Sequence, residues 1–378
     1  MDLEQRRWSK TAGWTRVNDG LERAADLVFV FGSREQMEST DRFDELRTAY
    51  PEAALFGCST GGEIQNARVF ENTVVTTAVA FEEAEARTAH VVLDDGTGSA
   101  DAGKRIAESL RAPDLNHVFV LSDGVHVNGS ELIRGVTKNV PERVTVTGGL
   151  AADGDRFERT PLWLDGLLEV PSIIGLGLYG DRLMVGHGSL GGWDPFGPDR
   201  RITRSDGNVL YELDNQSALD LYKKYLGSHA EKLPASGLRF PLAIRVPDES
   251  HEIVRTVIGI DEGAKSITFA GDVPEGAYAR FMKANNERLI DGAVGAAQSS
   301  RTQMKDTPIE LAILVSCIGR KQVLQQRIEE EVEHASRELG TAAGRIGFYS
   351  YGEISPVHDT TQCELHNQTM TITTLAEL

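Results

Sequence analysis

The chain repeats one pattern three times: an apolar strand, a helix, a second strand, and a tight glycine turn carrying small polar residues. The copies occupy residues 27–64, 117–154 and 311–356. Their paired strands read LVFVFGS and AALFGCSTGGEI, then HVFVLSDG and RVTVTGGLAADG, then LAILVSCIGR and RIGFYSYGEISP. Such self-similarity is typical of one supersecondary unit used repeatedly. It predicts an α/β protein, with α+β as the alternative, built from strand-helix-strand-turn-strand units in mixed sheets.

The first and third copies agree in further detail. Gly-Glu-Ile at 62–64 recurs at 352–354, and in both copies a threonine-rich strand follows after a short hairpin. Glu63 and Glu353 therefore close equivalent turns. We expect each either to accept backbone N–H bonds that make its own loop rigid, or to contact a ligand.

A length of 378 residues exceeds what one hydrophobic core usually supports, so we expect two domains. The glycine- and proline-rich segment 187–201 predicts an ordered loop or a hinge between them. The predicted division is an N-terminal extension at 1–24, an N-terminal domain at 25–200 and a C-terminal domain at 201–378.

Composition excludes several classes of protein. The formal net charge of −18 argues against nucleic-acid binding, which needs basic residues to neutralise phosphates. Three scattered cysteines favour neither a disulfide framework nor a structural zinc site and fit reduced thiols in the cytoplasm. No apolar run approaches the length of a membrane helix, and no secretory signal is present, so we expect a cytoplasmic protein without membrane insertion.

Eight motifs, in order along the chain, resemble one known family. GCSTGGEI at 57–64, SDGVHVNG at 122–129, TGGLAADGDRF at 147–157 and GHGSLGGWDPFGP at 186–198 resemble the N-terminal half of the FIST sensory family. ITRSDGNVLYELDNQSAL at 202–219, SCIGR at 316–320, GFYSYGEISP at 347–356 and HNQT at 366–369 resemble its C-terminal half.

The resemblance implies an input module that senses a small ligand inside the cell, amino acids being among those proposed. An alternative that it implies is a haem-binding nitric-oxide sensor that regulates a histidine kinase. Because the resemblance runs from about residue 25 to the end of the chain, we expect signalling to pass through a separate polypeptide.

The residues at the strand ends predict a ligand site. In the turn after Cys58, backbone N–H groups and the hydroxyls of Ser59 and Thr60 are suited to hold a carboxylate; alternatively, Gly61 and Gly62 only permit a positive-φ turn. Arg320, just after a buried strand, is suited to clamp a carboxylate, or else forms an ion pair with Glu353.

Tyr349 and Tyr351 alternate about Ser350 and would form an aromatic wall, or ordinary core. We therefore expect glycine turns from both halves to line a cleft near the domain junction. Arg320 and backbone amides would take the ligand's carboxylate, and closure about 187–201 would transmit occupancy to the partner. The candidate ligand-binding residues are Cys58, Ser59, Thr60, Gly61, Gly62, Glu63, Gly148, Gly149, Ser316, Cys317, Arg320, Tyr349, Tyr351 and Glu353.

A hydrolase is a further alternative, with Ser59 or Cys58 as the nucleophile. Cys317 is another candidate nucleophile, His126, His187 or His366 a candidate base, and Asp123 a candidate acid to orient it. Residues 57–61 match GxSxG, but the turn leads into a hairpin strand rather than a helix, which disfavours the nucleophile elbow. We therefore expect no enzymatic activity.

For the haem alternative, His187 or His126 is the candidate axial ligand of haem b. The chain has no CxxCH motif for covalent attachment and no HExxH motif. Our expectation is that the protein holds no metal and no cofactor.

Overall fold

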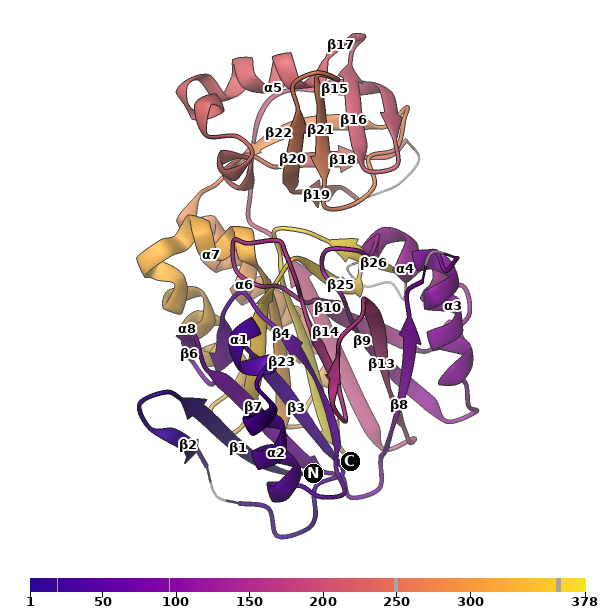
Figure 1. Cartoon of the computed structure of the whole chain (residues 1–378), viewed down its shortest axis with the longest axis vertical. Helices are drawn as coiled ribbons and strands as arrows, with labels where there is room; N and C mark the ends of the chain where they lie inside the picture. Colours follow the sequence, from indigo (N-terminus) through magenta and orange to yellow (C-terminus); the bar gives the residue numbers. More distant parts are fainter. Residues whose placement is uncertain (19, 95, 248–250, 358–361) are drawn as a thin grey trace.

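The computed structural model describes residues 1–378 except 19, 95, 248–250 and 358–361. A body of three mixed sheets carries a smaller domain above it (Figure 1). The small domain is formed by 194–283, between the last strand before it, β14 (Leu183–Leu190), and α6 (Asn286–Met304). The predicted α/β class, with mixed sheets built from repeated units, is confirmed.

The three sheets of the body share one strand order, and each holds the paired strands of one repeat. The first sheet runs β12 (Leu167–Leu168), β11 (Leu162–Leu164), β4 (Ala54–Ser59), β3 (Leu27–Gly32), β7 (Val74–Ala80), β1 (Asp2–Ser9), β2 (Gly13–Arg16). The second runs β26 (Cys363–His366), β25 (Gly352–Pro356), β10 (Thr145–Leu150), β9 (Leu115–Ser122), β13 (Ser172–Tyr179), β8 (Glu85–Val92). The third, from the opposite edge, runs β6 (Arg68–Phe70), β5 (Glu63–Gln65), β24 (Gly344–Ser350), β23 (Leu311–Cys317), β27 (Met370–Glu377), β14.

The hairpins that follow the glycine turns are exchanged between the sheets. The hairpin β5–β6 of the first repeat pairs with β24 of the third, and β25–β26 of the third pairs with β10 of the second. The hairpin β11–β12 of the second repeat pairs with β4 of the first. Each sheet is therefore completed by a neighbouring repeat, and the exchange closes into a ring.

Helices connect the parallel strands of each repeat. They are α1 (Arg34–Met37) with α2 (Thr40–Ala49), α4 (Gly129–Thr137), and α7 (Ile318–Leu324) with η3 (Gln325–Arg327) and α8 (Ile328–Leu339), while α3 (Ser99–Ser109) and α6 precede the second and third repeats. Asn128 caps α4 by accepting from the Glu131 N–H at 3.1 Å, as its sequence favours. The helical connections of the first and third repeats are each divided, and the one in the third repeat breaks at Gln325, where φ is +50°.

Aromatic side chains from all three repeats meet where the sheets face one another. The ring of Phe31 lies 4.6 Å from that of Phe348, and the ring of Phe29 lies 6.0 Å from that of Phe119. All four are buried. Removing each ring from contact with water contributes roughly 1.5–3 kcal/mol to the stability of the fold. This core therefore joins the repeats.

The small domain has its own core and a sheet of β19 (Ile253–Arg255), β18 (Leu242–Arg245), β22 (Tyr278–Lys283), β15 (Asp194–Asp206), β16 (Val209–Leu213), β21 (Ser266–Phe269) and β20 (Val257–Asp261). Short β17 (Gln216–Ser217), α5 (Ala218–Leu226), η1 (Gly227–Lys232) and η2 (Ala235–Arg239) complete it. Its core includes Ile202, Leu210, Tyr222, Phe269 and Phe281.

The prediction that 187–201 forms a loop or a hinge is wrong. Most of this segment is strand, in β14 and β15, because β27 and β22 supply hydrogen-bond partners to its backbone. Only 191–193 separates these two strands. The proposed boundary after residue 200 falls inside β15, and residues 2–16 contribute two strands to the first sheet.

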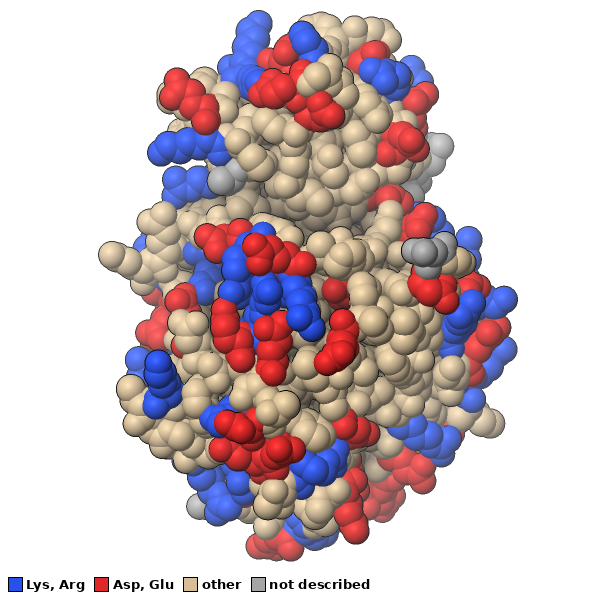
Figure 2. Space-filling view, viewed as in Figure 1, with Lys and Arg blue, Asp and Glu red and all other residues tan. Residues whose placement is uncertain are grey.

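Charged groups are mixed on the face shown in Figure 2, where basic and acidic side chains gather at the middle of the body, below the small domain. Both termini lie at the far end of the body from the small domain (Figure 1). The Met1 ammonium is 2.9 Å from Glu310 and 3.3 Å from Glu377. Within the described ranges, no helix combines the length and apolar character needed to cross a membrane.

Candidate functional site

The three glycine turns converge at the centre of the body. The same backbone hydrogen bond links each turn to the next: Gly61 N to Tyr349 O at 2.8 Å, Ala152 N to Ser59 O at 3.0 Å, and Tyr351 N to Leu150 O at 3.3 Å. Donors and acceptors occupy equivalent positions in the three repeats. The predicted convergence of turns from both halves of the chain is therefore present, as a ring of approximate threefold symmetry.

Two of the turns hold a buried glutamate in the same cradle. Thr60 donates its hydroxyl to Glu63 Oε1 at 2.6 Å, and Thr73 donates N–H and hydroxyl to Oε2 at 3.1 and 2.6 Å. In the third repeat, Ser350 donates to Glu353 at 2.7 Å, and Thr369 donates N–H and hydroxyl at 3.1 and 3.0 Å. The expectation that each glutamate accepts a backbone N–H bond is confirmed.

Burial controls the ionisation of these two carboxyl groups. It raises the pKa of Glu63 to about 7 and that of Glu353 to about 8, although the hydrogen bonds from the threonine and serine residues oppose the shift. Desolvation disfavours the charged form more than these donors favour it. Both groups therefore titrate near neutral pH.

The second repeat lacks the glutamate. Leu162 occupies the position in the first sheet that Glu353 occupies in the second sheet and Glu63 in the third. A longer loop, 153–161, precedes Leu162. Asp153 organises this loop by accepting N–H bonds from Phe157, Glu158 and Arg159 at 3.0–3.2 Å. At the equivalent position this repeat therefore has a leucine and an ordered loop in place of a buried glutamate.

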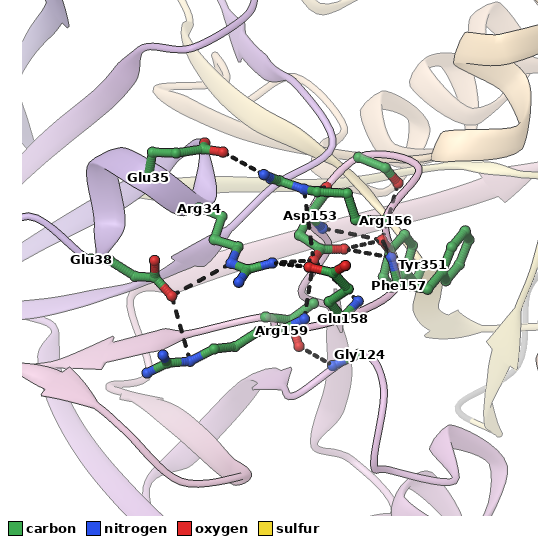
Figure 3. Close-up of polar contacts among 12 residues, drawn as sticks. Arg34, Glu35, Glu38, Gly124, Asp153, Arg156, Phe157, Glu158, Arg159 and Tyr351 are labelled. Atoms are coloured by element: carbon green, nitrogen blue, oxygen red, sulfur yellow. Dashed lines mark hydrogen bonds and ion pairs between the residues drawn. The ribbon is translucent and has the colours of Figure 1, made fainter.

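Figure 3 shows Asp153 at the centre of a network to which all three repeats contribute. Arg34 lies 3.2 Å from its carboxylate, and the Tyr351 hydroxyl donates to it. Although burial opposes ionisation, the bonds from Tyr351 and the backbone hold the pKa of Asp153 below its ordinary value. The Phe157 ring stacks on Tyr351 with centroids 4.3 Å apart. Asp153 is thus a structural carboxylate with its acceptors occupied.

The small domain covers the glutamate site of the third repeat, around Glu353. Asn367 and Gln368, which precede Thr369, are fully buried, and Gln368 donates to Leu238 O of the small domain at 3.2 Å. The corresponding residues before Thr73, Glu71 and Asn72, are exposed. The small domain therefore covers the residues that precede Thr369 in the third repeat, whereas the equivalent residues before Thr73 in the first repeat remain accessible.

The first site opens on a cleft of about 520 Å³. Its walls come from the turn of the first repeat, the start of the second repeat's loop, and α7 of the third. It is lined by Ser33, Glu35, Thr60, Gly61, Gly62, Glu63, Glu71, Asn72, Asp153, Gly154, Asp155, Arg156, Ile318, Lys321 and Gln322. Of three equivalent turn sites, the one around Glu63 borders this cleft.

Acidic groups outnumber basic ones around the cleft. Lys321 Nζ donates to Gly61 O at 2.6 Å and lies 2.7 Å from Glu71, and Arg156 is paired with Glu35. Both basic side chains are thus engaged with protein groups. The Ser33 hydroxyl is buried and has no hydrogen-bond partner in the described part of the chain. The cleft offers carboxylates and a hydroxyl, which suits a ligand that carries a positive charge.

Four of the predicted ligand-binding residues, Thr60 to Glu63, line the cleft. The amides of its glycines are occupied, since Gly61 donates to Tyr349 O and Gly62 to the Thr60 hydroxyl at 3.3 Å. The remaining strand-end candidates lie inside the sheets with little or no exposed surface; they are Cys58, Ser59, Gly148, Gly149, Ser316 and Cys317. A role for these six in binding remains a prediction.

Arg320 belongs to a buried network. Its guanidinium is fully buried, 2.8 Å from Glu331, and donates to the carbonyl oxygens of Gly191, Leu289 and Gln368. The ion pair predicted with Glu353 is wrong, because the helix α8 brings Glu331 into that position. Ser316 and Tyr349 donate to the other oxygen of Glu331 at 3.1 and 2.9 Å. Neither Arg320 nor the two tyrosines is among the cleft-lining residues.

The groups of the hydrolase and haem alternatives are dispersed. Burial raises the pKa of the Cys58 thiol well above its ordinary value, and the Ser59 hydroxyl is fully buried without a described partner. His126 lies 3.0 Å from Asp123 beside a separate cavity of about 270 Å³, whereas His187 is buried in β14. His366 faces Ser355 O. None of these histidines lines the cleft.

Comparison with known proteins decides the family. The FIST N domain model matches residues 26–216, and the FIST C domain model matches residues 218–356. The chain belongs to the FIST family. The junction of the two FIST models falls inside the small domain, between β17 and α5. An uncharacterized protein of Methanocaldococcus jannaschii is 24% identical over 389 residues, covering 89% of this FIST chain and 73% of that protein.

FIST domains are associated with sensory roles in signal transduction, in which they bind small ligands, rather than with catalysis. In the described part of this FIST protein, no three His, Cys, Asp or Glu side chains are grouped to hold a metal ion. The residues that sequence reasoning missed are Ser33, Glu35, Glu71, Asn72, Asp153, Gly154, Asp155, Arg156, Ile318, Lys321 and Gln322. The charged run DGDRFER at 153–159 was the sequence feature that could have indicated part of this lining.

Proposed function

We propose that this FIST protein senses a small ligand bearing a positively charged amino group, such as an amino acid, in the cleft beside Glu63. The observation that carries the proposal is the difference between equivalent sites. Two buried glutamates sit in the same cradle, but only the one in the first repeat lines the cleft. A carboxylate at a cleft wall, near Glu35, Glu71 and Asp155, favours an ammonium group.

The sequence prediction assigned the ligand's carboxylate to Arg320 and to backbone amides, but Arg320 and the amides of Gly61 and Gly62 are bonded to protein groups. The proposal therefore moves recognition to the amino group, which Glu63 and Glu71 would accept. Lys321 is the basic group nearest to a ligand carboxylate in the cleft, once Glu71 turns to the ligand. The output is proposed to pass through a separate signalling protein, of which a histidine kinase is the candidate.

Thermal unfolding with a panel of amino acids, simple amines and simple carboxylates tests the proposal. A probe at 100 times its dissociation constant adds about 2.7 kcal/mol to the free energy of unfolding. We expect at least one amine-bearing probe to raise the unfolding temperature. We also expect affinity to rise between pH 6 and 8, because Glu63, with a pKa of about 7, ionises in that range.

Glu63→Gln keeps the size of the side chain but removes its charge, so we expect it to lose the response. Glu353→Gln is the matched control: its carboxyl group accepts from the equivalent residues of the third repeat but is not among the groups that line the cleft, and it should keep the response. A wild-type protein that no probe stabilises, or a Glu63→Gln variant that responds like wild type, would refute the assignment.

A further inference from the structure

A second cavity, of about 410 Å³, lies between the small domain and the body. The body contributes α4 and β26, and the small domain contributes β18 and β19 with the turn after β21. Apolar side chains, among them Ile133, Ile244 and Ile253, share its lining with charged ones. None of its lining residues belongs to the cleft beside Glu63, so the two cavities are separate.

Arg255 lines this cavity and is only 5% exposed. Its Nε donates to Asp272 O at 3.0 Å and its Nη1 to Leu365 O at 2.8 Å. Both acceptors are neutral carbonyl groups, and no carboxylate of the described residues forms an ion pair with this guanidinium. Burial lowers the pKa of Arg255 to about 10, partly opposed by the charges of Glu364 and Asp272.

Arg320 provides the internal comparison. Among the described arginines it is the other one buried to this degree, and Glu331 lies 2.8 Å from it. A buried charge is ordinarily matched by an opposite charge, because desolvation is otherwise uncompensated. At Arg320 a carboxylate is in direct contact with the guanidinium, whereas at Arg255 the carboxylates of Glu364 and Asp272 act without forming an ion pair.

Glu364, on the other side of the cavity, shows the complementary deficiency. Its Oε1 lies 3.3 Å from His251 Nε2, while its Oε2 is buried without a hydrogen-bond donor in the described chain. The cavity thus presents a guanidinium with no carboxylate in direct contact and a carboxylate oxygen with no donor among the described residues. Buried polar groups are ordinarily hydrogen-bonded, so groups in this state call for an explanation, and a bound partner is one.

We propose that this cavity binds a small oxyanion, a carboxylate or a phosphate, that also carries a hydrogen-bond donor. Arg255 holds the oxyanion through its guanidinium, and Glu364 accepts from the donor. The isoleucine walls accommodate a short hydrocarbon part and exclude water. Because the two domains supply opposite walls, an occupant joins them and makes their relative position dependent on the ligand.

Calorimetric titration of the full-length protein with acetate, glycine, succinate and inorganic phosphate tests this site. We expect at least one of them to bind in the millimolar range or tighter, with glycine favoured over acetate by its donor. Phosphate binding in place of carboxylate binding would identify the oxyanion. Failure of all four to bind the wild-type protein overturns the proposal.

Two variants locate the binding. Thr137→Trp fills the cavity from α4, and Arg255→Lys keeps the charge but loses the planar fork; each is expected to raise the dissociation constant at least about tenfold. Thr48→Trp is the matched control, because both threonines donate to the carbonyl four residues earlier, at 2.8 Å, and Thr48 is exposed. It should bind like wild type.

The Glu63→Gln variant separates this proposal from the function assigned to the cleft. Binding that survives Glu63→Gln but is lost in Thr137→Trp supports the second cavity, whatever the cleft binds. Binding that is unchanged in both Thr137→Trp and Arg255→Lys, or that disappears in Glu63→Gln, refutes it.

Discussion

Glu63 and Glu353 are the residues in which local structure and chemistry are most closely linked. Each carboxyl group is buried, accepts three hydrogen bonds from its own repeat, and has its pKa raised toward neutrality. Their shared role in holding the turn explains why Gly-Glu-Ile appears in both copies. The role in ligand recognition is proposed for Glu63 alone, since it borders the cleft.

The raised pKa values predict how stability depends on pH. The folded protein keeps these carboxyls protonated at pH values where the unfolded chain has lost the protons, so their contribution is greatest below pH 4.5 and falls as pH rises to about 8. The slope is up to about 1.4 kcal/mol per pH unit for each group. Urea unfolding of wild type and of Glu63→Gln/Glu353→Gln between pH 5 and 8.5 measures it.

In the double variant we expect the free energy of unfolding to change less over this range than in wild type. Asp153 serves as the control carboxyl, because its pKa is lowered and its contribution is lost only at acidic pH. Parallel pH profiles for wild type and the double variant would contradict the assignment.

At the scale of elements, the strands of each repeat approach closely at one glycine. A Cβ added to Gly57, Gly148 or Gly347 would lie 1.8, 1.9 or 2.0 Å from a carbonyl oxygen of the neighbouring parallel strand. Gly148 also has a φ of +148°, which side chains rarely adopt. The same position in three repeats thus requires glycine for the same reason.

We therefore predict that Gly148→Ala destabilises the protein by about 3 kcal/mol or more, since both overlap and backbone strain oppose it. Gly154→Ala is the comparison, because its φ of +80° is also left-handed but no atom lies within 4 Å of the added Cβ; about 1 kcal/mol is expected. Chemical unfolding measures both. Equal losses would show that the close approach is unimportant.

The elements themselves were largely predictable from sequence. Runs such as LVFVFG and LAILVSC gave the buried strands β3 and β23, and the recurrence of Gly-Glu-Ile identified equivalent turns. The partners of the hairpins were not predictable, because strands as short as β5 and β25 carry no signal for the sheet they join. The partner of Arg320 was missed for a similar reason: Glu331 lies in a different helix, and its local sequence does not mark it as buried.

At the scale of the whole molecule, the small domain is inserted between β14 and α6, ahead of the third repeat. Its two ends are adjacent: a Cβ on Gly192 would lie 1.8 Å from Arg288 O, and Asp194 pairs with Lys283. Trp193, Met282 and Leu289 share one apolar cluster at the junction. The position of this domain, rather than the turn chemistry, decides which glutamate site is covered.

We predict that replacing 194–283 with a short glycine-serine linker leaves a folded body of three sheets, less stable than the full chain because Leu289 and Val323 lose apolar contacts. Dispersed amide NMR signals and a cooperative thermal transition at lower temperature are the expected result. A fully unfolded product would show that the small domain is required for the body to fold.

The ring of exchanged hairpins has a consequence for the ancestry of the chain. A lone copy of the repeat would lack an edge partner and could satisfy its backbone only by assembling with two others, as a trimer of identical chains would. Three identical subunits must carry three identical pockets. Copies joined into one polypeptide would be free to diverge, so that one could lose its glutamate, another be covered by an inserted domain, and a third keep its site open to a ligand.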